Sequence, residues 1–458
     1  MSTFTLGSPI PVEGTSFMAC IDAMGTIIPY EFTSWRDEVS SWTETAYLGA
    51  AIADVMPYSL KGAGCIDFLK KYAVNNFEKA PIGRSKHALM LNELGTIAAD
   101  GIALRLSEDE WLTSCLFPVI DFWLQKEHEA GNFLDVEGES LSGKSVLYQV
   151  GGPRSLEILE KAAQEDLHDI DYLCCRYATI AGQRVLVLRL GMAGTLSYEV
   201  HCGADHCEEV YSAILEAGQE FGIKRLGFHA YMMDHTENGF PQCGLHFYWD
   251  YRGLPGFHEW MMENVPWFEP MTICPENVGS YPDNVEAFYV SPYDIGWGYL
   301  INYSTHDFVG KEAALAKKNG MRREMVTLEW NADDVADVYR SQFAGGEAYM
   351  PMDSVNDYYA FLEYIAPQVA DKVLDADGNI IGISSGRGQI AHYNVMISLC
   401  MIDPAFAQEG TEVTVVWGNE NYPQKNIRAR VAKFPYLRMP SNGEFDVNSI
   451  PRRFPAKN

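Results

Sequence analysis

The sequence lacks long apolar runs and lacks any excess of basic residues. No apolar stretch approaches the roughly 18 residues that a membrane-spanning helix needs. The 34 Lys and Arg residues are outnumbered by 62 Asp and Glu residues, which gives a formal net charge of −28. A chain so acidic repels phosphate groups, so we expect no nucleic acid and no anionic membrane among its partners. The segment from Met1 to Gly14 lacks the basic start and apolar core of a signal peptide, which predicts a cytoplasmic location.

The cysteines lack the spacing of a metal-binding or redox motif. There are ten of them, spread along the chain, and none forms a CxxC pair. Without an export signal we expect reduced thiols rather than disulfides. Cys174 and Cys175 are adjacent, and a bond between them would be strained.

Length and composition indicate a globular protein of about three domains. The chain has 458 residues, of which 47% are apolar and 21% are charged. Apolar patterning bounded by turn residues predicts two strands within residues 86–106, around a turn at 92–95, and a third strand over 110–117. A helix is expected over residues 119–131, ending at Gly131.

The next part of the chain repeats this mixture of strands and helices. We expect a strand before the Gly-Gly-Pro turn, then a helix with Ser155 as its N-cap. Two further strands are predicted over residues 184–190 and 197–202. A helix follows, with Asp205 as a cap and Gly222 past its end. Strands followed by helices, with paired antiparallel strands, predict α+β layers.

The pattern changes towards the C-terminus. Residues 375–436 contain short strands separated by Gly, Asn and Asp turns, which is typical of a small all-β domain. The preceding segment, 333–366, is aromatic and acidic with weak periodicity. We interpret it either as an insertion or as an arm between domains.

The stretch from Leu190 to Cys207, LGMAGTLSYEVHCGADHC, raises the question of a phosphate loop or a metal site. Gly191 and Gly194 are followed by no Lys-Ser/Thr pair, and the loop runs into a predicted strand, so a turn is favoured over a phosphate loop. His201 and Cys202 are strand neighbours that point to opposite faces, and no second ligand cluster is apparent. Packing is therefore favoured over zinc.

Two further residues leave a functional and a structural interpretation open. Glu199 alternates with Tyr198 and Val200, so it faces either solvent or a pocket. In a pocket, its two acceptor oxygens suit a ligand with two adjacent N–H donors. Tyr231 lies in GFHAYMMDHTENGF, which is either a surface helix or the carrier of a phenolic proton donor.

These segments resemble the aminomethyltransferase superfamily, typified by the glycine-cleavage T-protein. Within it, the chain is most similar to the tetrahydrofolate-dependent aryl O-demethylases that act on vanillate and syringate. The resemblance covers the chain from about Trp35 to Tyr436. Its segments, in the family's order, are SKHALMLNELGTIAADGIALRLSEDEW, RLGMAGTLSYEVHCGADHCEEVYSAILEAGQEFG, SPYDIGWGYLINYSTHDFVGKEAAL, VLDADGNIIGISSG and RARVAKFPY.

The resemblance implies an α+β fold of three domains around a central folate cavity, two of them α+β and the last an all-β domain. The expected boundaries are a discontinuous first domain, an inserted second domain, a linking segment with the insertion, and a C-terminal β domain. In that order they cover residues 1–46 with 146–285, 47–145, 286–366 and 367–458.

Three site positions carry over through this resemblance. Asp100, in TIAADGIAL, corresponds to the acid near the reactive N5/N10 edge of the folate. Glu199 corresponds to the acid that binds the exocyclic amine and ring N–H of the pterin. Tyr231 stands where T-proteins have Arg and where aryl O-demethylases have Tyr, so the chain follows the demethylases at this position.

The chain also departs from the aromatic-acid demethylases at two positions. Ala53 and Asp54 occupy the place of a His-His pair, and Leu116 occupies the place of an Arg that is a plausible partner of a substrate carboxylate. A Leu at this position of the substrate pocket suits a neutral or differently placed ring, so a vanillate-type acid is not favoured.

The resemblance therefore implies methyl transfer from a small aryl methyl ether to N5 of tetrahydrofolate, the co-substrate, without a metal. Tyr231 is the expected catalytic acid, and Asp100 and Glu199 the expected folate-binding residues. The alternatives are a folate-dependent methyl or aminomethyl transferase with a sulfonium or amine donor, a glycine-cleavage T-protein, and a non-catalytic folate-binding protein. The methyl donor and the oligomeric state are left open.

Overall fold

The structure is a computed structural model in which the chain forms two compact units. It describes residues 10–11, 19–23, 26–50, 56–266, 278–281, 285–320, 323–352 and 369–456. The first unit comprises Met1–Leu89, Ala99–Asp234 and Arg438–Asn458, and the second comprises Met90–Ala98 and His235–Leu437. The domain boundaries expected from the resemblance stay a prediction.

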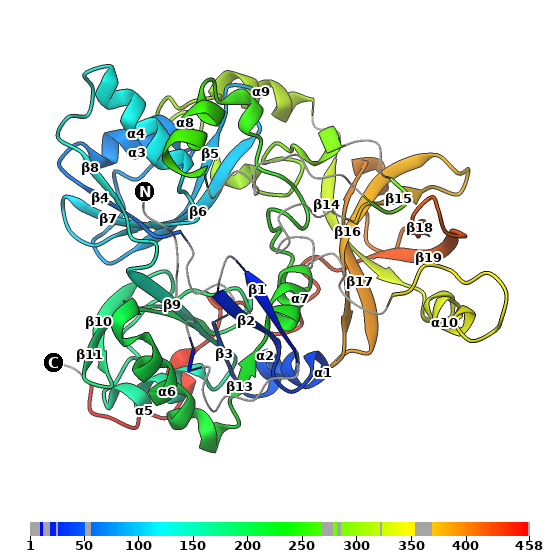
Figure 1. Ribbon diagram of the computed structural model, residues 1–458, viewed down its shortest axis with the longest axis horizontal. Coiled ribbons are helices and arrows are strands. Elements are labelled where there is room, and N and C mark those ends of the chain that lie inside the picture. Colours follow the sequence, from blue (N-terminus) through cyan, green and yellow to red (C-terminus); the bar gives the residue numbers. More distant parts are fainter. Residues whose placement is uncertain are drawn as a thin grey trace. The chain divides into compact units, whose positions relative to one another are not determined.

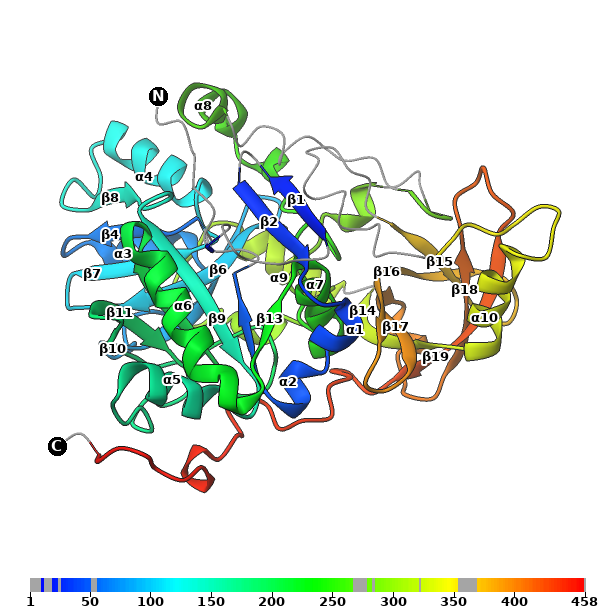
Figure 2. The same ribbon diagram turned by 60° about the horizontal axis from the view of Figure 1, so that its bottom comes forward.

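A six-stranded sheet forms the centre of the first unit, with the strand order β10-β11-β12-β9-β3-β13. The pairings are antiparallel except that of β13 with β3, which is parallel. Two helices, α5 (Ser155–Ala163) and α6 (Cys207–Gly218), contact one face of this sheet, and α6 crosses it in Figure 2. The strands are β3 (Tyr47–Gly49), β9 (Ser145–Gly151), β10 (Cys175–Ile180), β11 (Gln183–Leu188), β12 (Ser197–Gly203) and β13 (Lys224–Leu226).

Side-chain alternation along these strands builds two different faces. Tyr148, Val150, Tyr198 and Val200 belong to the apolar core beneath α5 and α6. The residues between them, such as Glu199, point to the opposite face because successive strand residues alternate. Both faces are covered, since Ser197 through Val200 are all buried.

A five-stranded sheet, also in the first unit, has the order β5-β6-β7-β4-β8 (Figure 1). The expected pair of strands around the turn at 92–95 is confirmed, and the third strand ends at Ser114 because Cys115 takes a positive φ of 61°. The elements are β4 (Tyr58–Lys61), α3 (Cys65–Tyr72), β5 (Ser85–Leu91), β6 (Ile97–Arg105), β7 (Glu110–Ser114), α4 (Val119–Glu129) and β8 (Glu137–Ser140).

The first unit is completed by short elements near its N-terminus. A hairpin and two short helices precede β3. Their bounds are β1 (Ala19–Ala23), β2 (Thr26–Glu31), α1 (Trp35–Glu38) and α2 (Ser41–Glu44). Helix α7 (Phe228–Asn238) begins in this unit, and its last four residues belong to the second.

Two expected helix caps are wrong. Ser155 is the first residue of α5 rather than its N-cap: its hydroxyl donates to the Leu196 carbonyl, while Arg154 precedes the helix. Asp205 lies inside a 3-10 turn, Ala204–His206, so α6 starts later and without a side-chain cap. Gly222 follows the helical segment with a φ of 71°, as expected, because this left-handed conformation favours glycine.

The second unit contains a closed six-stranded barrel, which confirms the all-β domain predicted near the C-terminus. Strand β14 closes the barrel because it pairs with both β17 and β19. Part of the segment 333–366 forms α10, and residues 353–368 lie outside the described part of the chain. The elements are α8 (Phe257–Asn264), α9 (Lys311–Asn319), β14 (Glu324–Trp330), α10 (Ala332–Ser341), β15 (Asp371–Leu374), β16 (Ile380–Ile390), β17 (Val395–Ile402), β18 (Glu412–Trp417) and β19 (Lys425–Ala432).

No helix in the described ranges is both long enough and apolar enough to cross a membrane. The eight cysteines whose side chains the structure describes are all free.

Candidate functional site

Glu199 lies on the face of the six-stranded sheet that points away from α5 and α6. It is 7% exposed, and it pairs with Leu188 on β11 and Gln149 on β9. A small pocket of the first unit lies above this face. Glu199, His201 and Leu188 line it from this sheet, and Ile102, Leu104 and Leu112 line it from the five-stranded sheet. Of the two orientations considered for Glu199, the structure therefore places it in a pocket rather than in solvent.

His201 lies beside Glu199, although no folate or catalytic role is predicted for it from the sequence. Its Nε2 atom lies 3.3 Å from Glu199 Oε2, and both side chains are about nine-tenths buried. Strand alternation places the two residues on the same face, because they are two positions apart. Alternation along the strand is therefore sufficient to predict that Glu199 and His201 lie on the same face.

Tyr231 projects from a helix that is buried rather than exposed. The surface-helix interpretation of residues 227–240 is wrong, since α7 is buried from Phe228 to Met233 and on through its next turn. Burial raises the pKa of the Tyr231 phenol, and the neighbouring Cys115, Asp234 and Glu199 raise it further. The phenol therefore keeps its proton at neutral and moderately alkaline pH, and it can act as an acid.

A buried carboxylate, Glu38, fixes the start of α7. Its Oε1 accepts the backbone N–H groups of Phe32 and Thr33, and its Oε2 accepts that of Gly227 at 2.7 Å. Gly227 is also close-packed, because a Cβ atom there would lie 2.3 Å from the Tyr30 carbonyl oxygen. No local pattern predicts this anchor, because it joins residues 189 positions apart.

Asp100 lies on β6 of the other sheet and contacts a different histidine. Its Oδ2 atom is 3.5 Å from His87 Nε2, and both side chains are largely buried. The next residue, Gly101, permits the close approach of β7: a Cβ atom there would lie 1.9 Å from the Ser114 carbonyl oxygen. The charge of Glu199 thus raises the pKa of Tyr231, whereas Asp100 contacts His87.

Leu116 is fully buried between β7 and α4. It directly follows Cys115, which is a neighbour of Tyr231. Leu116, which we predict to line the substrate pocket, is therefore adjacent in sequence to a residue that influences Tyr231. Ala53 and Asp54 lie outside the described residues.

The glycines and cysteines of LGMAGTLSYEVHCGADHC take the structural roles expected of them. Gly194 has a φ of 67° in a turn that leads directly into β12. Cys202 and Cys207 belong to the helix-covered core, whereas His201 is on the pocket face and His206 is half exposed. These four side chains therefore do not converge on one point.

A second phosphate-type pattern, GxxxxGK[ST], occurs at residues 138–145. Such a pattern binds phosphate when it leads into a helix N-terminus. Here it connects β8 to β9, so it leads into a strand. Lys144 forms an exposed ion pair with Glu139 at 2.6 Å. The structural context excludes a phosphate loop.

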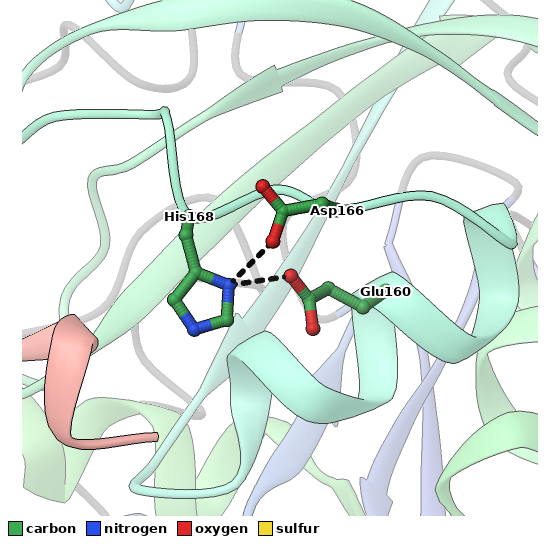
Figure 3. Close-up of side chains that lie close together, drawn as sticks. All are labelled: Glu160, Asp166 and His168. Atoms are coloured by element: carbon green, nitrogen blue, oxygen red, sulfur yellow. Dashed lines mark hydrogen bonds and ion pairs between the residues drawn. The ribbon is translucent and has the colours of Figure 1, made fainter. Parts of the chain in front are cut away.

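One group of three buried potential metal ligands is found within the described residues: Glu160, Asp166 and His168 (Figure 3). His168 Nδ1 lies 2.7 Å from Glu160 Oε1 and 3.0 Å from Asp166 Oδ1. Its Nε2 lies 3.0 Å from the carbonyl oxygen of Ile450, which can only accept. Both ring nitrogens therefore face oxygen atoms of neighbouring residues.

Arg452 also contacts this group. It donates to Asp166 Oδ2 at 2.5 Å, so Asp166 lies between a guanidinium and the His168 ring. We interpret the group as a buried ion-pair cluster that holds the C-terminal segment, with Ile450 and Arg452, against the rest of the first unit.

The chain is similar in sequence to several known proteins over most of its length. The model of the GCVT N-terminal domain matches residues 18–250. Sesamin methylene transferase of Sinomonas sp. strain No.22 is 40% identical over 447 residues, which cover 93% of this chain and 94% of that protein. Syringate O-demethylase of Sphingobium sp. strain SYK-6 is 28% identical over 437 residues, or 92% of each chain.

A solved structure extends the likeness to the fold. The glycine cleavage system aminomethyltransferase T from Bartonella henselae matches with a TM-score of 0.68 at 15% identity. The match covers 94% of this chain and 96% of that one. The fold expected from the sequence is therefore confirmed.

Proposed function

The chain belongs to the family of the GCVT N-terminal domain, and from that premise we propose that it transfers a one-carbon group from an aryl ether to tetrahydrofolate. Tetrahydrofolate is the co-substrate of this family. The methylene transferase at 40% identity and the O-demethylase at 28% identity favour an enzyme over a non-catalytic folate-binding protein. The observation that carries the proposal is Tyr231, a buried phenol close to Glu199.

Folate recognition is proposed for Glu199. Its carboxylate offers two acceptor oxygens, which suit the exocyclic amine and the ring N–H of a pterin. The pocket position and the burial of Glu199 support this role, because a charge-assisted hydrogen bond is stronger when water is excluded. Asp100 is proposed to orient the N5/N10 edge of the same co-substrate.

Tyr231 is proposed to protonate the leaving oxygen. A phenolate is a poor leaving group at neutral pH, since its conjugate acid has a pKa of about 10. In the methyl transfer, the bond between the ether oxygen and the methyl carbon breaks as a bond to N5 forms. Tyr231 donates a proton to the oxygen, and the proton lost from N5 restores the phenol. Such acid catalysis contributes about 10²–10⁴-fold to the rate. The buried side chain of Leu116 suits an uncharged aromatic ring, because it offers no partner for a substrate carboxylate.

A second donor class is favoured by a specific observation. The relative at 40% identity is named for methylene transfer, so an aryl methylenedioxy group is the alternative donor. Here two bonds from oxygen to the same carbon break and two bonds to N5 and N10 form. The protons of N5 and N10 pass to the two oxygens, which gives a catechol and 5,10-methylenetetrahydrofolate without any oxidant.

The test is an anaerobic incubation of the purified protein with tetrahydrofolate and a matched panel of methoxyarenes and methylenedioxyarenes. We expect 5-methyl- or 5,10-methylenetetrahydrofolate together with the corresponding phenol or catechol. Calorimetry with folate provides the control, because binding without product from any donor would support a non-catalytic folate-binding protein. Product from a sulfonium or amine donor alone would contradict the ether-cleaving function.

A further inference from the structure

A second buried phenol, Tyr47, lies on the same face of the six-stranded sheet as Glu199. Tyr47 pairs with Gly151 across β3 and β9, and Gly151 pairs with Ser197 on β12. The next row on this face consists of Gly49, Gln149 and Glu199. Tyr47 is therefore displaced from Glu199 by two strands and one row, on the side of the sheet that α5 and α6 leave free.

The sheet is shaped around the Tyr47 ring. A Cβ atom on Gly151 would lie 2.7 Å from Cε1 and Cζ of Tyr47 and 2.8 Å from its hydroxyl oxygen. Any side chain at Gly151 would therefore displace the phenol. The residue is fully buried, and within the part of the chain that the structure describes its hydroxyl has no partner in ordinary hydrogen-bond geometry, although the backbone of Ala193 is close enough to favour the ionised form slightly. A buried donor without an acceptor is unfavourable unless a ligand supplies the acceptor.

The surroundings of Tyr47 are those of the proposed site. Burial raises the pKa of its phenol, and the charges of Asp234 and Glu199 and the phenol of Tyr231 raise it further. Tyr231 responds in turn to Asp234 and Glu199. The two phenols therefore share one electrostatic environment, and both keep their protons.

The missing partner alone does not mark a site, and the other side of the sheet provides the contrast. Tyr198 is equally buried, and its hydroxyl also lacks a partner among the described residues. However, Tyr198 belongs to the helix-covered core, whereas Tyr47 shares its face with Glu199. The position of Tyr47 relative to Glu199 and Tyr231 distinguishes it.

We propose that Tyr47 is a second catalytic proton donor and that it serves a donor with two ether oxygens on the transferred carbon, an aryl methylenedioxy compound. This inference rests on the proposed function and extends it. Tyr231 protonates the first oxygen as its bond to the methylene carbon breaks and the bond to N5 forms. Tyr47 protonates the second oxygen as the remaining bond breaks and the bond to N10 forms. The protons lost from N5 and N10 restore the two phenols, so the step is balanced.

The experiment compares Tyr47→Phe with the wild-type protein on a methylenedioxyarene and on the methoxyarene of the same ring. We expect the wild type to convert the methylenedioxyarene to a catechol and 5,10-methylenetetrahydrofolate. Tyr47→Phe should lower kcat for this donor by about 100-fold. Methyl transfer from the methoxyarene, where it is detected, and folate affinity by calorimetry should stay within about threefold, because one oxygen requires one donor.

Tyr198→Phe is the matched control, since it removes an equally buried hydroxyl from the opposite face. It should leave both reactions unchanged. Tyr47→Phe should also keep or raise the melting temperature, because it removes a hydroxyl that lacks a partner. A fall in kcat at unchanged thermal stability is a result that a merely structural role would not give.

Three results would overturn the inference. The first is methylene transfer by Tyr47→Phe within threefold of the wild type. The second is an equal loss with both donors or a parallel loss of folate affinity, which would assign Tyr47 a general structural role. The third is a wild type that demethylates methoxyarenes but releases no methylene, which would leave the proposed function standing. Failure with every ether would instead contradict the proposed function itself.

Discussion

The two faces of the six-stranded sheet in the first unit are both buried, yet they differ in what buries them. On one face, Tyr148, Tyr198 and Val200 pack beneath α5 and α6. On the other, Glu199 and His201 line a pocket. Burial alone therefore does not identify a site in this protein. The chemical character of the buried side chains does, because a carboxylate is rarely buried without a partner or a function.

The helix-covered face is fully explained by packing, and the pocket face is not. A core of Val, Ile, Leu and Tyr side chains stabilises the fold by removing apolar surface from water. The pocket face instead holds a carboxylate, a histidine and two nearby phenols, which is unfavourable for stability. The difference indicates that the pocket face is maintained for chemistry, and each of the following experiments tests that separation.

The largest effect is expected for Tyr231→Phe. Loss of the proton donor should reduce kcat for ether cleavage by about 10²–10⁴-fold, because the phenolate would leave without a proton. Folate affinity should remain close to that of the wild type, since Glu199 is untouched. Steady-state kinetics and calorimetry measure the two quantities. Unchanged turnover would remove Tyr231 from the mechanism.

A smaller effect is expected for Glu199→Gln, which keeps the shape of the side chain and removes its charge. A hydrogen bond to a charged group contributes about 1.5–3 kcal/mol, so folate affinity should fall by about 10- to 100-fold. The neighbouring Val200→Ala serves as the control from the other face. It should lower the free energy of unfolding by about 2 kcal/mol and leave folate affinity unchanged. Equal effects of both substitutions on affinity would abolish the distinction between the faces.

The smallest effect is expected in the pH profile of kcat. Burial and the neighbouring negative charges raise the pKa of Tyr231, so its acid form persists as the pH rises. Ionisation of Tyr231 should therefore cause no fall in kcat between about pH 8 and pH 10, where an ordinary tyrosine begins to titrate. An alkaline fall with a midpoint near pH 10 that disappears in Tyr231→Phe would show that the phenol is not shielded.

Local patterns in the sequence were sufficient to predict some of these features. Alternation around Glu199 placed Tyr198 and Cys202 on one face and His201 on the other, because strand geometry depends only on neighbouring residues. The turn at Gly194 and the β domain near the C-terminus were predictable for the same reason. The family resemblance supplied what these patterns could not, namely a reason to examine Tyr231.

The features that could not be predicted depend on contacts between distant segments. Tyr47 lies on a strand of only three residues, whose place between β9 and β13 depends on pairing with residues about 100 and about 180 positions away. The burial of α7 had no clear sequence signal, and its anchor at Glu38 bonds to Gly227. Such contacts depend on the tertiary fold, which single-sequence patterns do not encode.

The ion-pair cluster around His168 has a consequence for the order in which the protein forms. Its partners Ile450 and Arg452 are synthesised only after the whole of His235–Leu437. Synthesis proceeds from the N-terminus, and domains generally fold as they emerge. In this chain, the contacts of Asp166 and His168 with the C-terminal segment instead form only after the second unit has been synthesised. The first unit is thus begun before the second unit and completed only after it.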